Sequence, residues 1–335
     1  MSMQPSFRSG VGKDVRQYIA HKRSLGRSFD GAIRVLADLD GFLSGMAIDI
    51  APLQDLTAET FTKWSESLGH LCPNTKLARL RVVLKFCIYR RRSTPECFVP
   101  DPTQFPKRCP LFRPFIFSGS DVARVLGHCH KQREHPARSP LRWANTRLAV
   151  ILLYATGMRR GELLRLTPND YNAPDRTLLI RASKFHKSRL LPLPNELAGE
   201  VERHLRSRRA KHPSALHTEP ILWSPYGRER SYSGIWLRRN VNHLLRSAGI
   251  KKHDGRQPRI HDFRHSFAVN ALIRWYRGGA NVQAKLPLLA TWMGHVSIFS
   301  TYHYLHFVDE LRESANERFA EAYSSVVVPA GGSAR

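Results

Sequence analysis

The stretch that decides the fold of this chain reads Met293-Gly294-His295-Val296-Ser297-Ile298-Phe299-Ser300-Thr301-Tyr302-His303-Tyr304. About thirty residues upstream stands His261-Asp262-Phe263-Arg264-His265, and a third segment, Ala155-Thr156-Gly157-Met158-Arg159-Arg160-Gly161-Glu162, lies earlier. In order, the segments supply an arginine, a His-x-x-Arg pair, a Gly-His pair and a tyrosine nine residues after that histidine. No single segment is specific, but their shared order and spacing are.

This order and spacing resemble the catalytic half of the tyrosine recombinases, the phage-integrase family, which cut and rejoin DNA. The resemblance extends over about residues 117–323. It implies a mainly α-helical protein with a small antiparallel β patch, in which two domains clamp DNA. We therefore expect a helical core-binding domain at 1–94, a proline-rich basic linker at 95–116, the catalytic domain at 117–323 and a flexible tail at 324–335.

Composition agrees with a polyanionic partner. Lys and Arg number 53 against 27 Asp and Glu, which gives a formal charge of +26. Charge alone allows DNA, RNA or an anionic membrane, but no apolar run reaches the ~18 residues of a spanning helix. The N-terminus has no signal-peptide pattern, and five cysteines without a close pair indicate reduced thiols. We expect a cytoplasmic, nucleoid-associated protein of bacterial type that binds double-stranded DNA and no membrane.

The N-terminal part carries the expected DNA contacts. A helix is predicted from about Thr75 to Arg92, and seven of its residues are basic while none is acidic. A solvated basic face is the ordinary alternative, although the missing acids favour phosphate contact. The predicted apolar stripe is Leu77, Leu80, Leu84, Cys87 and Ile88. With two linker residues, the predicted DNA contacts are Lys76, Arg79, Arg81, Lys85, Arg90, Arg91, Arg92, Lys107 and Arg108.

Two arginines suit the chemistry of phosphodiester cleavage. Without a metal ion, cleavage needs an in-line nucleophile, positive charge at the non-bridging oxygens and a proton for the leaving oxygen. Arginine fills the second role because its planar fork bonds two phosphate oxygens and stays charged. The resemblance selects Arg159 and Arg264. Arg160 is the neighbour that could replace Arg159.

Histidines accompany these arginines. His261 and Arg264 are three residues apart, which places them on one face of a helix. A lone histidine there would more often be structural, but the pair resembles the His-x-x-Arg box of the family. His265 adds a His-x-x-x-His spacing that would permit zinc, yet the glutamate that zincin-type sites use as their base is missing. We expect no metal.

The final segment supplies the nucleophile. The resemblance implies that His295 bonds the scissile phosphate and that Tyr304 attacks it. A phenol has a pKa of roughly 10, so attack at neutral pH needs nearby arginines or a histidine that accepts the proton. A buried aromatic is the ordinary interpretation of Tyr302 and Tyr304 alike. The nine-residue step from His295 selects Tyr304.

A lysine on a β hairpin commonly protonates the leaving oxygen in this family. Two short strands are predicted, at 177–181 and 189–193, and Lys184 lies between them. Lys187 is the rival, and Ser183 stands where relatives often carry glycine. The resemblance implies a 3′-phosphotyrosyl intermediate that keeps the bond energy, so we expect no cofactor.

The sequence carries fewer signals for assembly and biological role than for the site residues. Apolar residues recur on one face of a predicted helix at 307–323. Such a stripe ordinarily packs inside its own chain, whereas relatives often dock this helix on a neighbour. We expect a homotetramer on synapsed DNA, with possible accessory recombinases. The main hypothesis is an integrase, recombinase or transposase of a mobile element. The alternatives are a type IB topoisomerase-like enzyme and a catalytically silent DNA-binding regulator of the same fold.

Overall fold

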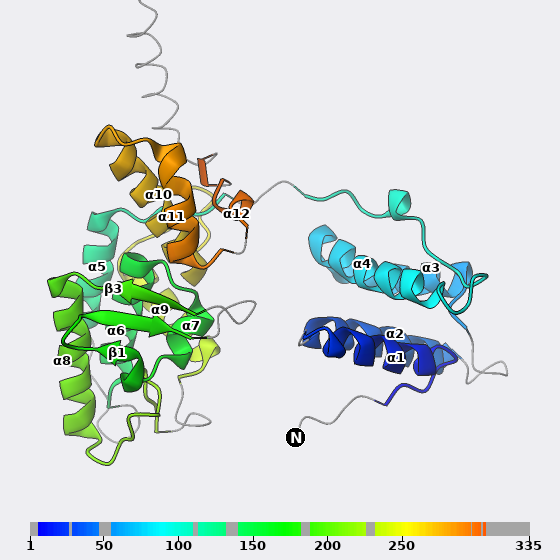
Figure 1. The fold of residues 1–335 in the computed structure, drawn as a ribbon, viewed down its shortest axis with the longest axis horizontal. Coiled ribbons are helices and arrows are strands. Elements are labelled where there is room, and N and C mark those ends of the chain that lie inside the picture. Colours follow the sequence, from blue (N-terminus) through cyan, green and yellow to red (C-terminus); the bar gives the residue numbers. More distant parts are fainter. Residues whose placement is uncertain are drawn as a thin grey trace, which may run out of the picture. The chain divides into compact units, whose positions relative to one another are not determined.

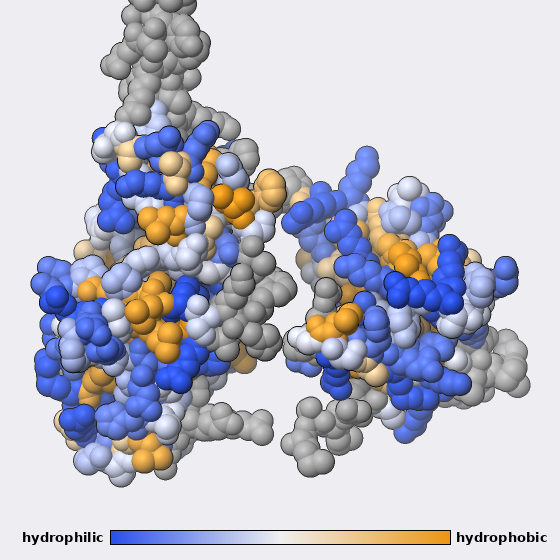
Figure 2. All heavy atoms as spheres, viewed as in Figure 1, coloured by the Kyte–Doolittle hydropathy of each residue, from blue (hydrophilic) through white to orange (hydrophobic). Residues whose placement is uncertain are grey.

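The computed structural model describes residues 6–26, 29–46, 55–109, 113–131, 140–181, 188–225, 232–295, 297–302 and 304–305. The chain divides into two compact units, an N-terminal unit of Met1–Phe112 and a C-terminal unit of Arg113–Arg335 (Figure 1). In the described part, no helix is long and apolar enough to cross a membrane. Figure 2 shows that the visible surface of both units is largely hydrophilic, with separate hydrophobic patches.

The N-terminal unit is helical. Its elements are α1 (Gly12–Ser24), α2 (Asp30–Met46), α3 (Ala58–Ser67), η1 (Leu68–His70), α4 (Pro73–Arg90) and η2 (Pro102–Gln104). Helix α4 packs against both α1 and α2. Thr57 caps α3: its hydroxyl accepts a hydrogen bond from the backbone N–H of Thr60, and its own backbone N–H donates to the Thr60 hydroxyl.

The buried face of helix α4 agrees with the predicted stripe at Leu77, Leu80 and Cys87 and differs from it elsewhere. The prediction placed Ile88 in the core, but its side chain is exposed. The buried positions follow three- and four-residue steps and are Leu77, Leu80, Val83, Phe86, Cys87 and Arg90. Because Arg90 continues that buried face, it does not belong to the basic surface of the helix.

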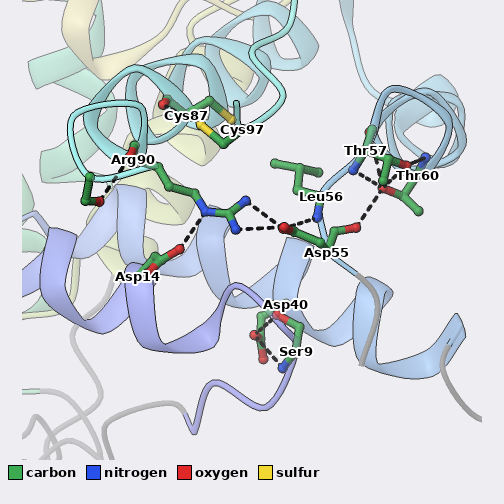
Figure 3. A network of polar contacts seen from close by, with 11 residues as sticks. Ser9, Asp14, Asp40, Asp55, Leu56, Thr57, Thr60, Cys87, Arg90 and Cys97 are labelled. Atoms are coloured by element: carbon green, nitrogen blue, oxygen red, sulfur yellow. Dashed lines mark hydrogen bonds and ion pairs between the residues drawn. The ribbon is translucent and has the colours of Figure 1, made fainter. Parts of the chain in front are cut away.

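Arg90 instead joins three parts of the N-terminal unit (Figure 3). Its Nε donates to Asp14 on α1 at 2.5 Å, and its Nη1 and Nη2 donate to Asp55 at 2.6 and 2.8 Å. The hydrogen bonds that Arg90 donates to Asp55 raise the pKa of Arg90 further. The expectation that Arg90 contacts DNA is therefore wrong, because two carboxylates occupy its guanidinium.

The proline-rich segment packs onto the N-terminal unit as far as it is described. Phe98 and Phe105 lie against its core, with ring centroids 5.7 and 6.3 Å from that of Phe61. The backbone N–H of Cys109 donates to the side chain of Asn74 at 3.0 Å. Hydrophobic side chains between the prolines thus hold this segment against α3 and α4.

The C-terminal unit surrounds the central helix α6 (Arg142–Thr156) with other helices and adds a small sheet. Helix α6 packs against α5, α8, α9 and α10. The remaining elements are α5 (Gly119–His130), α7 (Arg160–Arg165), η3 (Pro168–Asp170), β1 (Tyr171–Asn172), β2 (Thr177–Ile180), β3 (Arg189–Pro192), α8 (Asn195–Lys211), α9 (Gly234–Ser247), α10 (Ile260–Arg277), α11 (Val282–Met293) and α12 (Phe299–Tyr302).

The predicted antiparallel patch is confirmed, and it gains a third strand. The order is β1-β2-β3, and Leu178 pairs with Leu191 across the two longer strands. Leu178 and Ile180 face the core, as the alternation of the strand requires. Figure 1 shows α10, α11 and α12 gathered at one end of this unit, while the sheet and α8 lie toward the other end.

Candidate active site

The first arginine is positioned by a turn that only glycine adopts without strain. Helix α6 ends at Gly157, whose φ of 64° lies in the left-handed region. A Cβ there would lie 2.4 Å from Cδ1 of Phe267 on α10. The close contact brings the chain against α10 before α7 begins. Arg159 follows as the N-cap residue of α7 and is partly exposed.

Glu162 fixes the position of this arginine through hydrogen bonds. Its carboxylate accepts the backbone N–H of Arg159 at 2.9 Å and the Nη1 of Arg159 at 2.7 Å. The same carboxylate accepts Nη2 of Arg189, on β3, at 2.8 Å. Burial opposes its ionisation, but the hydrogen bonds from Arg189 and Arg159 prevail and lower the pKa of Glu162 to about 2. Sequence reasoning did not include Glu162 or Arg189 in the site.

Arg264 is the second arginine and is only 2% exposed. Its Nη1 donates to the carbonyl of Gly157 at 2.6 Å, and its Nη2 donates to the carbonyl of Met293 at 2.7 Å. Burial and the nearby charge of Arg159 lower the pKa of Arg264 to about 10, so it remains charged at pH 7. Both of these acceptors are neutral carbonyls, and within the described residues no carboxylate is hydrogen-bonded to this guanidinium.

A second left-handed glycine, Gly294, precedes His295 and brings it close to Arg159. Gly294 ends α11 with a φ of 65°, and its carbonyl accepts Nη2 of Arg159 at 2.8 Å. His295 then places its Nδ1 2.8 Å from Oγ1 of Thr301. Burial and the charges of Arg264 and Arg159 lower the pKa of His295 to about 3, which keeps the ring neutral at pH 7.

Tyr304 lies in this same site and is 4% exposed. Its ring centroid is 5.5 Å from that of His265 and 6.1 Å from that of His295, and it is nearly parallel to the His295 ring. Burial raises the pKa of Tyr304, while the charge of Arg264 and a hydrogen bond with it act in the opposite direction. Tyr302 is exposed and contacts Phe299 instead.

His261 and His265 complete the cluster on α10. Their rings meet edge to face at 4.8 Å, and His261 faces solvent. Burial and the charge of Arg264 lower the pKa of His261, while burial and the neighbouring His261 lower that of His265 to about 4. Within the described ranges, no group of three His, Cys, Asp or Glu side chains is placed to hold a metal ion.

A basic cleft opens beside this cluster. It encloses about 800 Å³, and its lining includes the side chains of Arg159, Arg160, Arg238, Arg239, Arg259 and His261. Arg160, the rival of Arg159 in the sequence, begins α7, and its guanidinium lies against the start of α9, where a Cβ on Gly234 would be 3.3 Å from it. Sequence reasoning did not single out Arg238 and Arg239. The available signal was the helical spacing of the apolar residues Leu237, Val241 and Leu244, which leaves Arg238 and Arg239 on the exposed face.

The other predicted residues differ in how the structure places them. Lys184 and its rival Lys187 lie outside the described residues. Arg79 forms an ion pair with Asp38 at 3.0 Å, and Lys76 is partly buried. The exposed members of the predicted DNA-contact set are Arg81, Lys85, Arg91, Arg92, Lys107 and Arg108.

Known proteins resemble this chain in sequence and in fold. The model of the phage integrase family matches residues 118–310. The Sinorhizobium fredii protein y4rB, provisionally named an integrase/recombinase, is 30% identical over 305 residues, which is 91% of this chain and 95% of that protein. The tyrosine recombinase XerD of Caulobacter vibrioides is 30% identical over 280 residues, or 82% and 84% of the two chains.

A solved structure of the Tn1549 transposon integrase in complex with a circular intermediate DNA shares the fold. It aligns with a TM-score of 0.63 at 16% identity and covers 92% of this chain and 99% of that one. The fold, the family match over more than half of the chain and the nearly full-length relatives agree. They show that this protein belongs to the phage integrase family, the tyrosine recombinases, and is an integrase/recombinase.

Proposed function

We propose that Tyr304 is the nucleophile with which this recombinase cuts DNA, and that Arg159, Arg264, His261 and His295 bind the scissile phosphate. One observation carries the assignment: Tyr304 is buried against His295 and beside Arg264, whereas Tyr302 faces solvent. Arg264 is bonded to backbone carbonyls, so its positive charge is available to a phosphate.

The reaction has two steps. The Oη of Tyr304 bonds to phosphorus as the bond from phosphorus to the 5′ oxygen breaks, which leaves a 3′-phosphotyrosyl link and a protonated 5′-hydroxyl. A 5′-hydroxyl of a partner strand then attacks phosphorus and releases the tyrosine. The phenol proton leaves Tyr304 in the first step and returns to it in the second, so the sequence is balanced without ATP.

The charges around the site suit this reaction. Two arginines stabilise the added negative charge of the pentavalent transition state. The lowered pKa values of His261, His265 and His295 leave these rings neutral and able to donate or accept one proton each. Lys184 is the proposed acid for the leaving oxygen, with Lys187 as its rival.

DNA is the proposed substrate and partner. Among the described residues that line the cleft beside the site there are arginines and amide side chains but no acidic side chain. XerH bound to its difH substrate shares the fold, with a TM-score of 0.58 at 18% identity over 86% of this chain and 79% of that one. In the N-terminal unit, Arg81, Lys85 and Arg92 are exposed along α4 and its end and would add phosphate contacts.

Similar proteins support a proposal for the biological setting of this enzyme. We infer that the enzyme serves a mobile genetic element, since a transposon integrase shares its fold over nearly the full length. It would act as a homotetramer on synapsed DNA, with residues 307–323 docking on a neighbour and accessory recombinases as possible partners. The expected place of action is the bacterial cytoplasm.

A suicide DNA substrate tests the assignment of Tyr304. The DNA carries the element's ends and a nick near the crossover point, so that a cut strand diffuses away and the covalent adduct accumulates. In EDTA, wild type and the matched control Tyr302→Phe should form a denaturant-stable adduct, and Tyr304→Phe should form none. An adduct in Tyr304→Phe would move the nucleophile elsewhere. Tight DNA binding without any adduct would favour the silent regulator.

A further inference from the structure

Thr301 makes a side-chain contact that the reaction scheme above does not use. It lies on α12, is 0% exposed, and donates its backbone N–H to the carbonyl of Ile298 at 2.8 Å. Its hydroxyl oxygen is 2.8 Å from Nδ1 of His295. Among the residues that the structure describes, His295 is the hydroxyl's hydrogen-bond partner.

The direction of this hydrogen bond follows from the burial of the hydroxyl. If Nδ1 of His295 carried a proton, it would donate to Thr301, and the hydroxyl proton would face no described acceptor. A buried donor without an acceptor is costly, because it has lost its hydrogen bond to water. If the hydroxyl donates to Nδ1, both groups are satisfied. The second arrangement places the single proton of the neutral ring on Nε2.

The ring must be neutral for this choice of tautomer to exist. Burial, and the charges of Arg264, Arg159 and Arg189, keep the pKa of His295 far below neutrality. The nearby His261 adds no positive charge at pH 7, because its own pKa is lowered as well. Thus His295 presents one N–H and one lone pair, and its neighbour decides which nitrogen holds each.

We propose that Thr301 is a positioning residue that fixes His295 in the Nε2–H tautomer, so that the imidazole donates a hydrogen bond to a non-bridging oxygen of the scissile phosphate. The proposal rests on the function proposed above for His295 and Tyr304. It makes His295 a third donor beside Arg159 and Arg264. It also links the phosphate-binding histidine to the nucleophile, because Thr301 lies three residues before Tyr304 in the same short segment.

The first test reads the tautomer and needs no DNA and no activity. Protein labelled with ¹⁵N at histidine gives distinct nitrogen shifts for protonated and unprotonated ring nitrogens. The His295 signals are identified as those lost in His295→Gln. We expect Nδ1 of His295 to be the unprotonated nitrogen at pH 7 in wild type. A ring protonated at Nδ1, or at both nitrogens, would overturn the proposal.

The second test measures single-turnover adduct formation on the suicide substrate. Thr301→Val removes the hydroxyl at nearly constant volume, and Thr301→Ser retains it. We expect Thr301→Val to cleave about tenfold to a hundredfold more slowly, as expected for weakening one hydrogen bond to a charged oxygen. Thr301→Ser should recover most of the rate, and Ser300→Ala, an exposed hydroxyl on the same helix, should match wild type.

The outcomes separate this inference from the function on which it rests. A wild-type rate in Thr301→Val would reject the role of Thr301 while leaving the nucleophile assignment intact. Absence of an adduct in wild type would reject the proposed chemistry, and the tautomer measurement would still decide what Thr301 does. If Thr301→Val failed to fold, the wild-type spectrum and the Thr301→Ser rate would carry the test.

Discussion

Two buried arginines, one in each unit, are stabilised by opposite means. Arg90 of the N-terminal unit is bonded to the carboxylates of Asp14 and Asp55, which neutralise it. Arg264 of the C-terminal unit is bonded to the carbonyls of Gly157 and Met293, which orient it without neutralising it. The partners of a buried arginine, more than its burial, therefore distinguish a structural charge from one available to a substrate.

The largest effect should come from Arg264→Gln. The variant loses a fixed positive charge at the scissile phosphate, so adduct formation should slow by about 10²–10³-fold, the usual cost of removing one preorganised donor. Single-turnover cleavage of the suicide substrate measures the rate, and circular dichroism confirms folding. Arg277→Gln, an exposed arginine on the same helix, is the control. Equal rates in the two variants would remove Arg264 from the catalytic set.

Arg90→Met should have the opposite profile. It breaks the contacts of α4 with Asp14 and Asp55, which should cost about 2 kcal/mol of unfolding free energy, since hydrogen bonds to charged groups are lost. Cleavage by the folded protein at saturating DNA should stay at the wild-type rate. Denaturant unfolding followed through Trp64, in the core of the N-terminal unit, measures the change. Arg91→Met, at the exposed next position, should leave stability within about 0.5 kcal/mol.

The smallest effect is a pH dependence that only the N-terminal arginine should show. Burial raises the pKa of Asp55, but the hydrogen bond from Arg90 outweighs it, so the folded pKa lies below the unfolded value of 3.8. The stability from this pair is therefore complete above about pH 4 and is lost as the pH falls through the folded pKa. The cost of Arg90→Met should shrink in that acid range. The carbonyl partners of Arg264 do not titrate, so Arg264→Gln should show no matching change; a parallel acid dependence in both variants would contradict the comparison.

The sequence predicted which residues gather in the C-terminal unit better than it predicted the surfaces. The family resemblance selected Arg159, Arg264, His295 and Tyr304, and the structure brings these residues from three segments to one site. The β patch also followed from local alternation. The roles of these residues stay predictions until the cleavage experiments are done.

Other features could not be predicted from the sequence, because they depend on contacts between segments that lie far apart in the chain. A run of basic residues on α4 says nothing about which of them meets an acid from another helix, so Arg90 was placed on the wrong face. Glu162 and Arg189 lie 27 residues apart and come together only through the fold. The arginines of α9 reach the cleft for the same reason.

Residue type and interval are enough to indicate the family, the order of the predicted site residues and the positive charge that suits DNA. Tertiary structure alone decided which arginines are neutralised, how Tyr304 is buried between two histidines, and which hydroxyl meets His295. Those properties depend on distances between segments far apart in the chain. Burial then amplifies them, because a charge or a proton that has lost its contact with water must find a partner in the protein.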